Sequence, residues 1–151
     1  MRRLTLENCK EEIWDDLISI IPNREIENNE YFITSTEVMV VLSNGDKIVI
    51  PGGFRFDGSS VPKFLRSIFS TYGPFLLSAM IHDWLYKTDY KRELWGLKKA
   101  QLFSDDEMLI WSEVMNYASK RQRLNNKLRH RAVRLFGKGV YKKRSDVKTN
   151  I

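Results

Sequence analysis

The spacing of apolar residues changes along the chain, and this change predicts a first helix, then strands, and then further helices. Apolar side chains at helical spacing over Leu6–Ile21 predict a helix with Asn8 in the N-cap position. Tyr31–Leu42 is rich in β-branched and aromatic residues, which predicts one or two strands. An Asn-Gly pair at 44–45 then predicts a tight hairpin turn, and Lys47–Ile50 is the expected returning strand.

Helical periodicity dominates the rest of the chain. The predicted helices are Val61–Phe69, Phe75–Tyr86, about Ala100–Lys120 and about Asn125–Phe136, with a polar connection over Lys87–Leu97. In the third of these, Asp105 lies one turn before the apolar Met108, so it should point inward, whereas Asp106 should be exposed. In the last, the side chains expected to point inward are Leu128, Ala132, Leu135 and Phe136.

These elements predict an α+β fold, in which a short N-terminal antiparallel hairpin or sheet packs on a mainly helical body. The length of 151 residues fits a single domain over residues 1–151. Within it, residues 1–28 are expected to form the N-terminal helix and a linker, and residues 142–151 a flexible tail.

Composition limits where the chain is expected to reside. The hydrophobic share of 42% and the charged share of 29% are typical of a globular protein and unlike a disordered one. With the single cysteine Cys9, no intramolecular disulfide can form, which fits a reducing compartment or a virion assembled in one. We see no signal peptide and no apolar run near the roughly 20 residues that span a bilayer. A cytoplasmic location is therefore expected, unless a larger assembly carries the chain out.

The net charge of +6 is concentrated near the C-terminus. Between Lys120 and Arg144 there are eleven Lys or Arg and no Asp or Glu. Such a segment favours a polyanionic partner, which means nucleic acid, an anionic membrane or an acidic protein surface. Arg129, Arg131 and Arg134 are the candidate contacts. The alternative is a solvated cationic helix face without a partner.

The most unusual local chemistry lies between residues 52 and 86. Asp57-Gly58-Ser59-Ser60-Val61-Pro62 forms one end of this stretch, and His82-Asp83-Trp84-Leu85-Tyr86 forms the other. Glycine allows a tight backbone in the first segment, so that its polar groups can face a ligand, although Asp57 can equally be a helix cap. Too few Cys and His are present for a structural zinc site, and no Gly-rich phosphate loop occurs.

His82 and Asp83 are the candidate chemical groups of this stretch. Neighbouring helical residues point about 100° apart, so we expect the two not to bond each other but to use different partners. A histidine oriented by another carboxylate can act as general base on water, and Asp105 on the next helix can supply that carboxylate. Asp83 and Asp57 can then hold a divalent cation. The alternative is a buried histidine bonded to Asp105 or Asp57 for structure alone.

The two segments resemble an uncharacterised protein family of tailed bacteriophages and prophages. That family carries GF-x-x-D-[GF]-x-S-[VI]-P followed by A-x-[IV]-HD-x-LY, here Gly53–Pro62 and Ala79–Tyr86. Its A-V-R-L-F-G ending matches Ala132–Gly137, so the resemblance covers roughly Tyr31 to Gly137. It implies a phage-encoded protein, in the host cytoplasm or in the virion, with other phage structural proteins or the host envelope as partners.

A second, shorter resemblance is to the secreted phospholipases of the A class, whose catalytic helix carries HD-x-x-Y, here His82, Asp83 and Tyr86. In those enzymes the His activates water, the adjacent Asp binds calcium and a second Asp orients the His. The resemblance implies these roles for His82, Asp83 and Asp105, with calcium as the cation. The chain departs from the pattern in lacking the flanking cysteines and a Gly-x-Gly calcium loop.

Three hypotheses for function follow. The first is a hydrolase that acts on a lipid ester of the bacterial envelope, with a substrate assigned by analogy alone. The second is a non-enzymatic virion or tail-associated component, and the third is a nucleic-acid-binding accessory protein. The hydrolase hypothesis predicts a pocket open to solvent at His82, and the structural hypothesis predicts that His82 is sealed and fully bonded.

Overall fold

The computed structural model describes residues 1–9, 14–21, 32–56 and 75–115, and positions 124, 127–128, 130–132 and 134–135 near the C-terminus. Among these described residues, six strands lie in the first part: β1 (Arg2–Leu4), β2 (Ile18–Ile20), β3 (Phe32–Thr34), β4 (Val38–Val41), β5 (Lys47–Ile50) and β6 (Arg55–Phe56). The helices are α1 (Trp14–Leu17), α3 (Phe75–Lys87), α4 (Arg92–Trp95) and α5 (Leu97–Met115). The predicted α+β class is thereby confirmed.

The strands form two small sheets. In the first, β4 lies between β1, with which it is parallel, and β5, with which it is antiparallel. In the second, β3 lies between β2 and β6 and is antiparallel to both. The predicted hairpin is confirmed as β4–β5, and its turn has Gly45 at φ 86°, a backbone angle that glycine adopts without strain.

The predicted helix over Leu6–Ile21 is wrong for most of its described length. Only Trp14–Leu17 is helical, and Ile18–Ile20 is a strand that pairs with β3. Before it, Thr5 and Asn8 close a turn, because the Asn8 Oδ1 accepts from the Thr5 backbone N at 2.8 Å. Asn8 is therefore a turn residue and no N-cap. The alternation Ile18-Ser19-Ile20 also fits a strand, and the pairing with β3 selects the strand over the helix at these residues.

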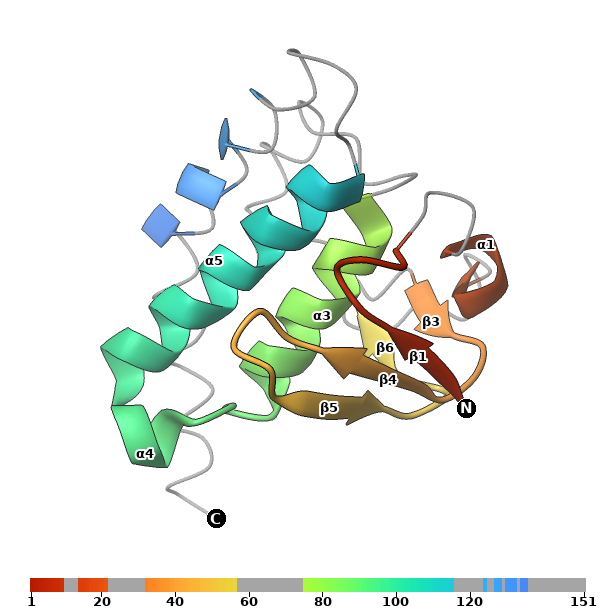
Figure 1. The fold of residues 1–151 in the computed structure, drawn as a ribbon, viewed down its shortest axis with the longest axis horizontal. Coiled ribbons are helices and arrows are strands. Elements are labelled where there is room, and N and C mark those ends of the chain that lie inside the picture. Colours follow the sequence, from red (N-terminus) through yellow and green to blue (C-terminus); the bar gives the residue numbers. More distant parts are fainter. Residues whose placement is uncertain are drawn as a thin grey trace.

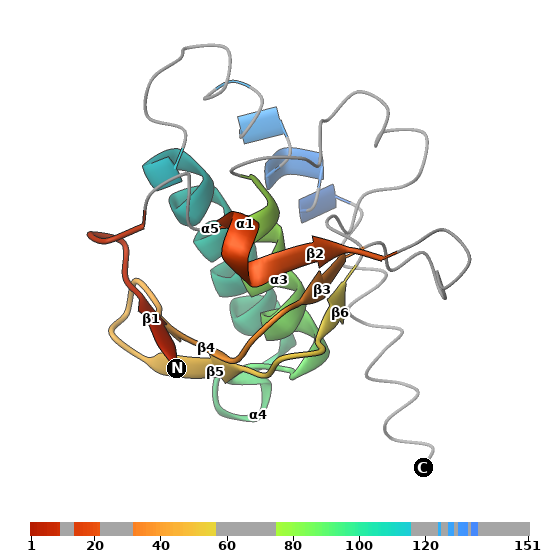
Figure 2. The same cartoon turned by 90° about the vertical axis from the view of Figure 1, so that its right-hand side faces the viewer.

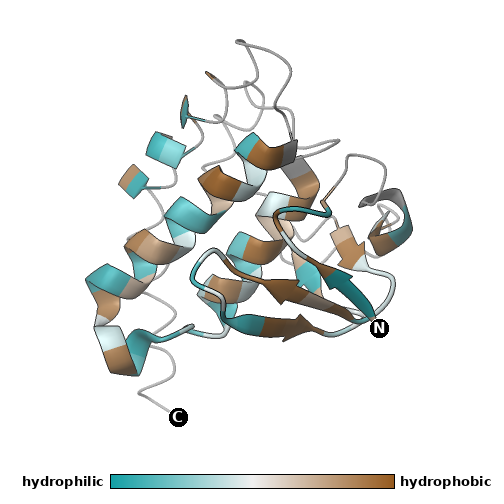
Figure 3. Cartoon of the chain, viewed as in Figure 1, coloured by the Kyte–Doolittle hydropathy of each residue, from teal (hydrophilic) through white to brown (hydrophobic). Residues whose placement is uncertain are grey.

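The helical part brings α3 and α5 side by side. The two helices run antiparallel, and α3 lies between α5 and the strands (Figure 1). The apolar core lies around α3 and beneath both sheets, with Phe56, Met80 and Trp111 among its largest buried side chains. The sheets curve round α3, as the turned view shows (Figure 2). Apolar and polar residues alternate along α5, which matches a helix with one buried side (Figure 3).

The connection between α3 and α5, expected to be polar, contains the one-turn helix α4 (Arg92–Trp95), which was not predicted. The chain enters this helix through Asp89 and Lys91, both at positive φ, and leaves it through Gly96 at φ 82°. The prediction for α5 is confirmed over residues 100–115, and the helix begins three residues earlier, at Leu97. Asp105 is buried and Asp106 exposed, as expected.

The described C-terminal positions are all helical, in agreement with the predicted last helix. Ala132 is buried as expected, but Leu128 and Leu135 are exposed, with 76% exposure at Leu135. The prediction that these two leucines point inward is wrong. His130 and Arg134, one turn apart, instead contact α5 through Asp106. None of the described helices combines the length and apolarity needed to cross a membrane.

Candidate functional site

The side chains of α3 that carry the candidate chemistry lie on the buried side of that helix. His82 and Tyr86 are four residues apart, so one helical turn stacks them, and their ring centroids are 4.1 Å apart. Asp83, the next residue after His82, is also buried. Because α3 is apolar over most of its length, these polar groups must find partners within the protein.

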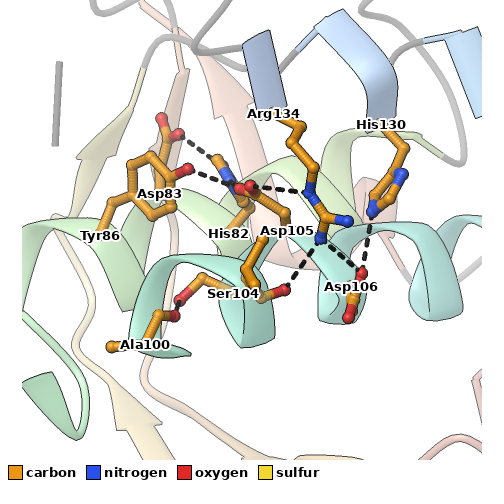
Figure 4. A network of polar contacts seen from close by, with 10 residues as sticks. His82, Asp83, Tyr86, Ala100, Ser104, Asp105, Asp106, His130 and Arg134 are labelled. Carbon is orange, nitrogen blue, oxygen red and sulfur yellow. Dashed lines mark hydrogen bonds and ion pairs between the residues drawn. The ribbon is translucent and has the colours of Figure 1, made fainter. Parts of the chain in front are cut away.

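Asp105 of α5 is the partner of both rings. The Nε2 atom of His82 lies 2.9 Å from the Asp105 Oδ1, and the Tyr86 hydroxyl donates to the same oxygen at 2.5 Å (Figure 4). The antiparallel packing of α3 on α5 creates this contact between residues 23 positions apart. The sequence-based expectation that Asp105 meets His82 is therefore met in the geometry. One ring nitrogen of His82 is fixed by a carboxylate that is itself held by a phenol.

The other ring nitrogen faces Asp83. The distance from His82 Nδ1 to Asp83 Oδ1 is 3.7 Å, too long for a good hydrogen bond but close enough for a strong electrostatic attraction. As expected, these adjacent residues form no dyad through a short hydrogen bond. The expectation that they act through wholly different partners is wrong, because the helix brings the carboxylate back to the imidazole of its neighbour.

The two carboxylates control the protonation of His82. Burial alone would lower its pKa, but the hydrogen bond and charge of Asp105, and then the nearby carboxylate of Asp83, raise the pKa to about 9. The imidazole is therefore a cation at neutral pH, held between two anions. Only 1% of the residue is exposed to solvent. The hydrolase hypothesis predicted an open pocket at this ring, so that prediction is not met, and the sealed ring agrees with the structural hypothesis.

The metal-binding part of the hypothesis falls largely outside the described residues, since Asp57 and the loop to Pro62 belong to the stretch between 56 and 75. Within the described ranges, no group of three or more His, Cys, Asp or Glu side chains is arranged to hold a metal ion. Calcium takes six to eight oxygen ligands, and Asp83 supplies one carboxylate. The described residues by themselves therefore do not fit a calcium site, and no step below passes through a metal.

The three arginines assigned to a polyanion are differently placed. Arg129 lies outside the described residues, and Arg131 is exposed. Arg134 instead reaches toward α5, where its Nη2 donates to Asp106 Oδ1 at 2.8 Å and its Nε lies 3.9 Å from Asp105 Oδ2. His130 Nε2 also meets Asp106 Oδ1, at 2.9 Å. Arg134 is thus occupied with carboxylates of its own chain, which makes it a poor contact for an external polyanion.

Two features of the site were missed from sequence. Tyr86 was noted as part of the HD-x-x-Y pattern without a role, although its spacing of four residues from His82 places it on the same helical face. A further buried carboxylate, Glu107, accepts from the Ser43 backbone N at 3.2 Å and from the Trp111 Nε1 at 3.1 Å. The spacing of Glu107 and Trp111 signals that contact, but only the fold brings Ser43 to it.

Comparison with known protein families identifies one that spans all of these residues except Arg134. A family model described as "Protein of unknown function (DUF1353)" matches residues 34–133, well over half of the chain. The chain belongs to the DUF1353 family. The matched range includes His82, Asp83 and Asp105, and it ends one residue before Arg134. Comparisons of this DUF1353 chain with curated proteins and with solved structures each found no match.

Proposed function

We propose that this DUF1353 chain is a bacteriophage-encoded hydrolase in which His82 is the general base and Asp105 orients it. One observation carries the proposal: Asp105 Oδ1 binds His82 Nε2 at 2.9 Å and Tyr86 Oη at 2.5 Å, both within the buried interface of α3 and α5. This arrangement fixes the imidazole through one nitrogen and leaves Nδ1 without a short hydrogen bond to Asp83. A carboxylate–histidine pair of this kind is the usual way to orient a catalytic base.

The chemistry follows from the protonation of His82. In its neutral form the ring keeps a proton on Nε2, donated to Asp105, and offers the Nδ1 lone pair to a water molecule. Nδ1 takes a proton as the water oxygen attacks the carbonyl carbon of an ester, and Asp105 stabilises the imidazolium that forms. The imidazolium then returns the proton to the departing alkoxide, so one water and one ester give one acid and one alcohol.

Two conditions limit this reaction. A pKa of about 9 keeps the base protonated at neutral pH, so the rate should rise between pH 7 and pH 9. Water and substrate must also reach Nδ1, which requires an opening around a ring that is 1% exposed. Catalytic contacts often form fully only when substrate is bound, so the closed ring alone does not decide against the proposal.

The substrate and the origin of the chain rest on resemblance. The HD-x-x-Y pattern, with Asp105 and Tyr86 meeting as described, favours an ester of a lipid from the bacterial envelope. The two motifs at Gly53–Pro62 and Ala79–Tyr86 support a phage protein located in the host cytoplasm or virion. A divalent cation held by Asp83 and Asp57 stays part of the proposal as a separate expectation.

A second candidate function is favoured by the burial of His82. If the ring stays sealed, the cluster fixes α3 on α5, and the chain is a non-enzymatic virion or tail-associated component. Buried ionic groups of this type select one packing arrangement in some proteins without adding stability. In that case the basic C-terminal segment, represented among the described residues by the exposed Lys127 and Arg131, is the surface offered to an acidic partner or nucleic acid.

The test uses the full chain and vesicles of phosphatidylethanolamine and phosphatidylglycerol, with fatty acid release followed by mass spectrometry, with and without calcium. We expect release by the parent chain and a loss of roughly 10²–10⁴-fold in Asp105→Asn. Glu113→Gln is the matched control, because Glu113 is an exposed carboxylate on the same helix. No release by the parent at pH 7–9 contradicts the proposal, and so does an Asp105→Asn variant as active as the control.

A further inference from the structure

Arg134 joins the C-terminal segment to the candidate site. Its guanidinium donates through Nη2 to Asp106 Oδ1 at 2.8 Å and to the Leu102 carbonyl oxygen at 3.4 Å. These two contacts lie one turn apart on α5, so they hold the guanidinium against that helix (Figure 4). From this position the Nε atom lies 3.9 Å from Asp105 Oδ2.

The two atoms that face each other, Asp105 Oδ2 and Arg134 Nε, each lack a hydrogen-bond partner among the described residues. Asp105 Oδ1 already binds His82 and Tyr86, whereas Oδ2 is buried and has no hydrogen-bond partner among the described residues. Arg134 Nε is likewise buried without a hydrogen-bond partner in that part of the chain. Leaving a buried charged donor and acceptor unsatisfied costs free energy, and these two atoms of opposite charge lie 3.9 Å apart. A closer approach of about 1 Å would give a charge-assisted hydrogen bond of ordinary length.

The charges in the cluster also support a pairing of Arg134 with Asp105. His82, as a cation, lies between the buried carboxylates of Asp83 and Asp105. Arg134 brings a further cation to Asp105 and cannot lose its proton, so it can compensate negative charge there at any ordinary pH. Among the described residues, Asp105 is thus approached by His82 on one oxygen and by Arg134 on the other.

We propose that Arg134 is a positioning residue of this site, which holds the Asp105 carboxylate through Oδ2 so that Oδ1 stays directed at His82 and Tyr86. The inference rests on the proposed hydrolase function for its effect on rate. Its structural content, a cation from the C-terminal segment that orients Asp105, stands independently of that function. Arg134 touches no reacting atom in this scheme and acts only through Asp105.

The test compares Arg134→Gln and Arg134→Lys with Arg131→Gln, a matched control at an exposed position of the same segment. The first readout is the proton resonance of the His82 Nε2–H group, which among histidine resonances has only those of His130 to be distinguished from. The second is kcat and KM for fatty acid release from the phosphatidylethanolamine and phosphatidylglycerol vesicles.

We expect Arg134→Gln to shift the His82 resonance and to lower kcat by roughly 10-fold to 100-fold with KM nearly unchanged, since small misplacements of a catalytic pair have effects of this size. Arg134→Lys should restore part of both, because it returns the charge but not the planar fork. Asp106→Asn weakens the contact that holds the Arg134 guanidinium against α5, so it should shift the His82 resonance in the same direction as Arg134→Gln does. Arg131→Gln should change neither readout.

The inference is overturned if Arg134→Gln leaves the His82 resonance where it is in the parent, or if Arg131→Gln shifts it equally. A parent chain that releases no fatty acid contradicts the proposed function, and the resonance then decides the positioning role by itself. If Arg134→Gln fails to fold, the same comparison is made between Arg134→Lys and Asp106→Asn, both of which keep hydrogen-bonding side chains at the contact.

Discussion

Raising the pH from 6 to 9 should destabilise the folded chain through a single buried group, His82. Its folded-state pKa is raised to about 9, against an ordinary value of 6.5, because Asp105 and then Asp83 overcome the opposing effect of burial. Above pH 6.5 the unfolded chain has lost this proton and the folded chain still holds it. The stabilisation is therefore fully present below pH 6.5 and disappears as the pH approaches 9.

The size of the effect follows from the two pKa values. One pKa unit corresponds to about 1.4 kcal/mol, so the interval between 6.5 and about 9 corresponds to about 3 kcal/mol of unfolding free energy. For a chain of this length the melting temperature should fall by roughly 2–4 °C for each kcal/mol, or roughly 10 °C in total. Burial also raises the pKa of the Cys9 thiol, to about 11. The destabilisation that follows from this shift sets in at higher pH than this interval.

The assay is urea unfolding followed by tryptophan fluorescence at a series of pH values, with His82→Asn measured in the same buffers. Among the described residues, the groups that face the ring are Asp105, Asp83 and Tyr86, with Arg134 beyond Asp105, so the variant removes the titrating member and keeps these neighbours. The parent should lose about 3 kcal/mol and the variant much less. A parent that is equally stable at pH 6 and pH 9, or a variant with the same slope, refutes a charged His82 between two carboxylates.

Two further substitutions test other parts of the fold by the same unfolding assay. Glu107→Ala should destabilise by about 1–3 kcal/mol, because it leaves the buried Nε1 donor of Trp111 unsatisfied and removes the acceptor of the Ser43 backbone N. Glu113→Ala, at an exposed site, should stay within about 0.5 kcal/mol of the parent, and equal losses in the two variants would contradict a buried role for Glu107. Gly96→Ala should cost about 1–3 kcal/mol through the backbone alone, since φ is 82° and an added Cβ meets no atom within 4 Å; an unchanged unfolding midpoint would contradict it.

The local sequence pattern was sufficient to predict those elements that its own periodicity and turn residues determine. The β4–β5 hairpin follows from alternation around Asn44-Gly45, and α3 and α5 follow from long helical periodicity. The N-terminal segment could not be read in this way. Ile18 fits a helical stripe with Leu17 and Ile21 as well as a strand alternation with Ile20, and the partner that decides, β3, lies more than ten residues away.

The same limit applies to the candidate site. Asp105 was placed correctly because its distance of one turn from Met108 fixes its face of α5. The approach of Asp83 to the ring of its neighbour depends on side-chain torsions that spacing does not specify. Arg134 was read as part of a cationic surface because a run of charges carries no information about which member turns inward. The exposed Leu128 and Leu135 were predicted to point inward because apolar side chains usually face the core. In the structure His130 and Arg134 make the contact with α5 instead.

The central claim is that His82 is a base, and the most direct measurement is fatty acid release by His82→Asn from phosphatidylethanolamine and phosphatidylglycerol vesicles at pH 8, together with urea unfolding of the same preparation. His130→Asn is the control, because it makes the same replacement at the only other histidine. Asparagine keeps one donor and one acceptor but takes no proton at this pH. A hydrolase with His82 as base predicts a folded variant whose rate falls roughly 10²–10⁴-fold while the control keeps the parent's rate. A folded His82→Asn variant that releases fatty acid as fast as the parent would contradict the claim.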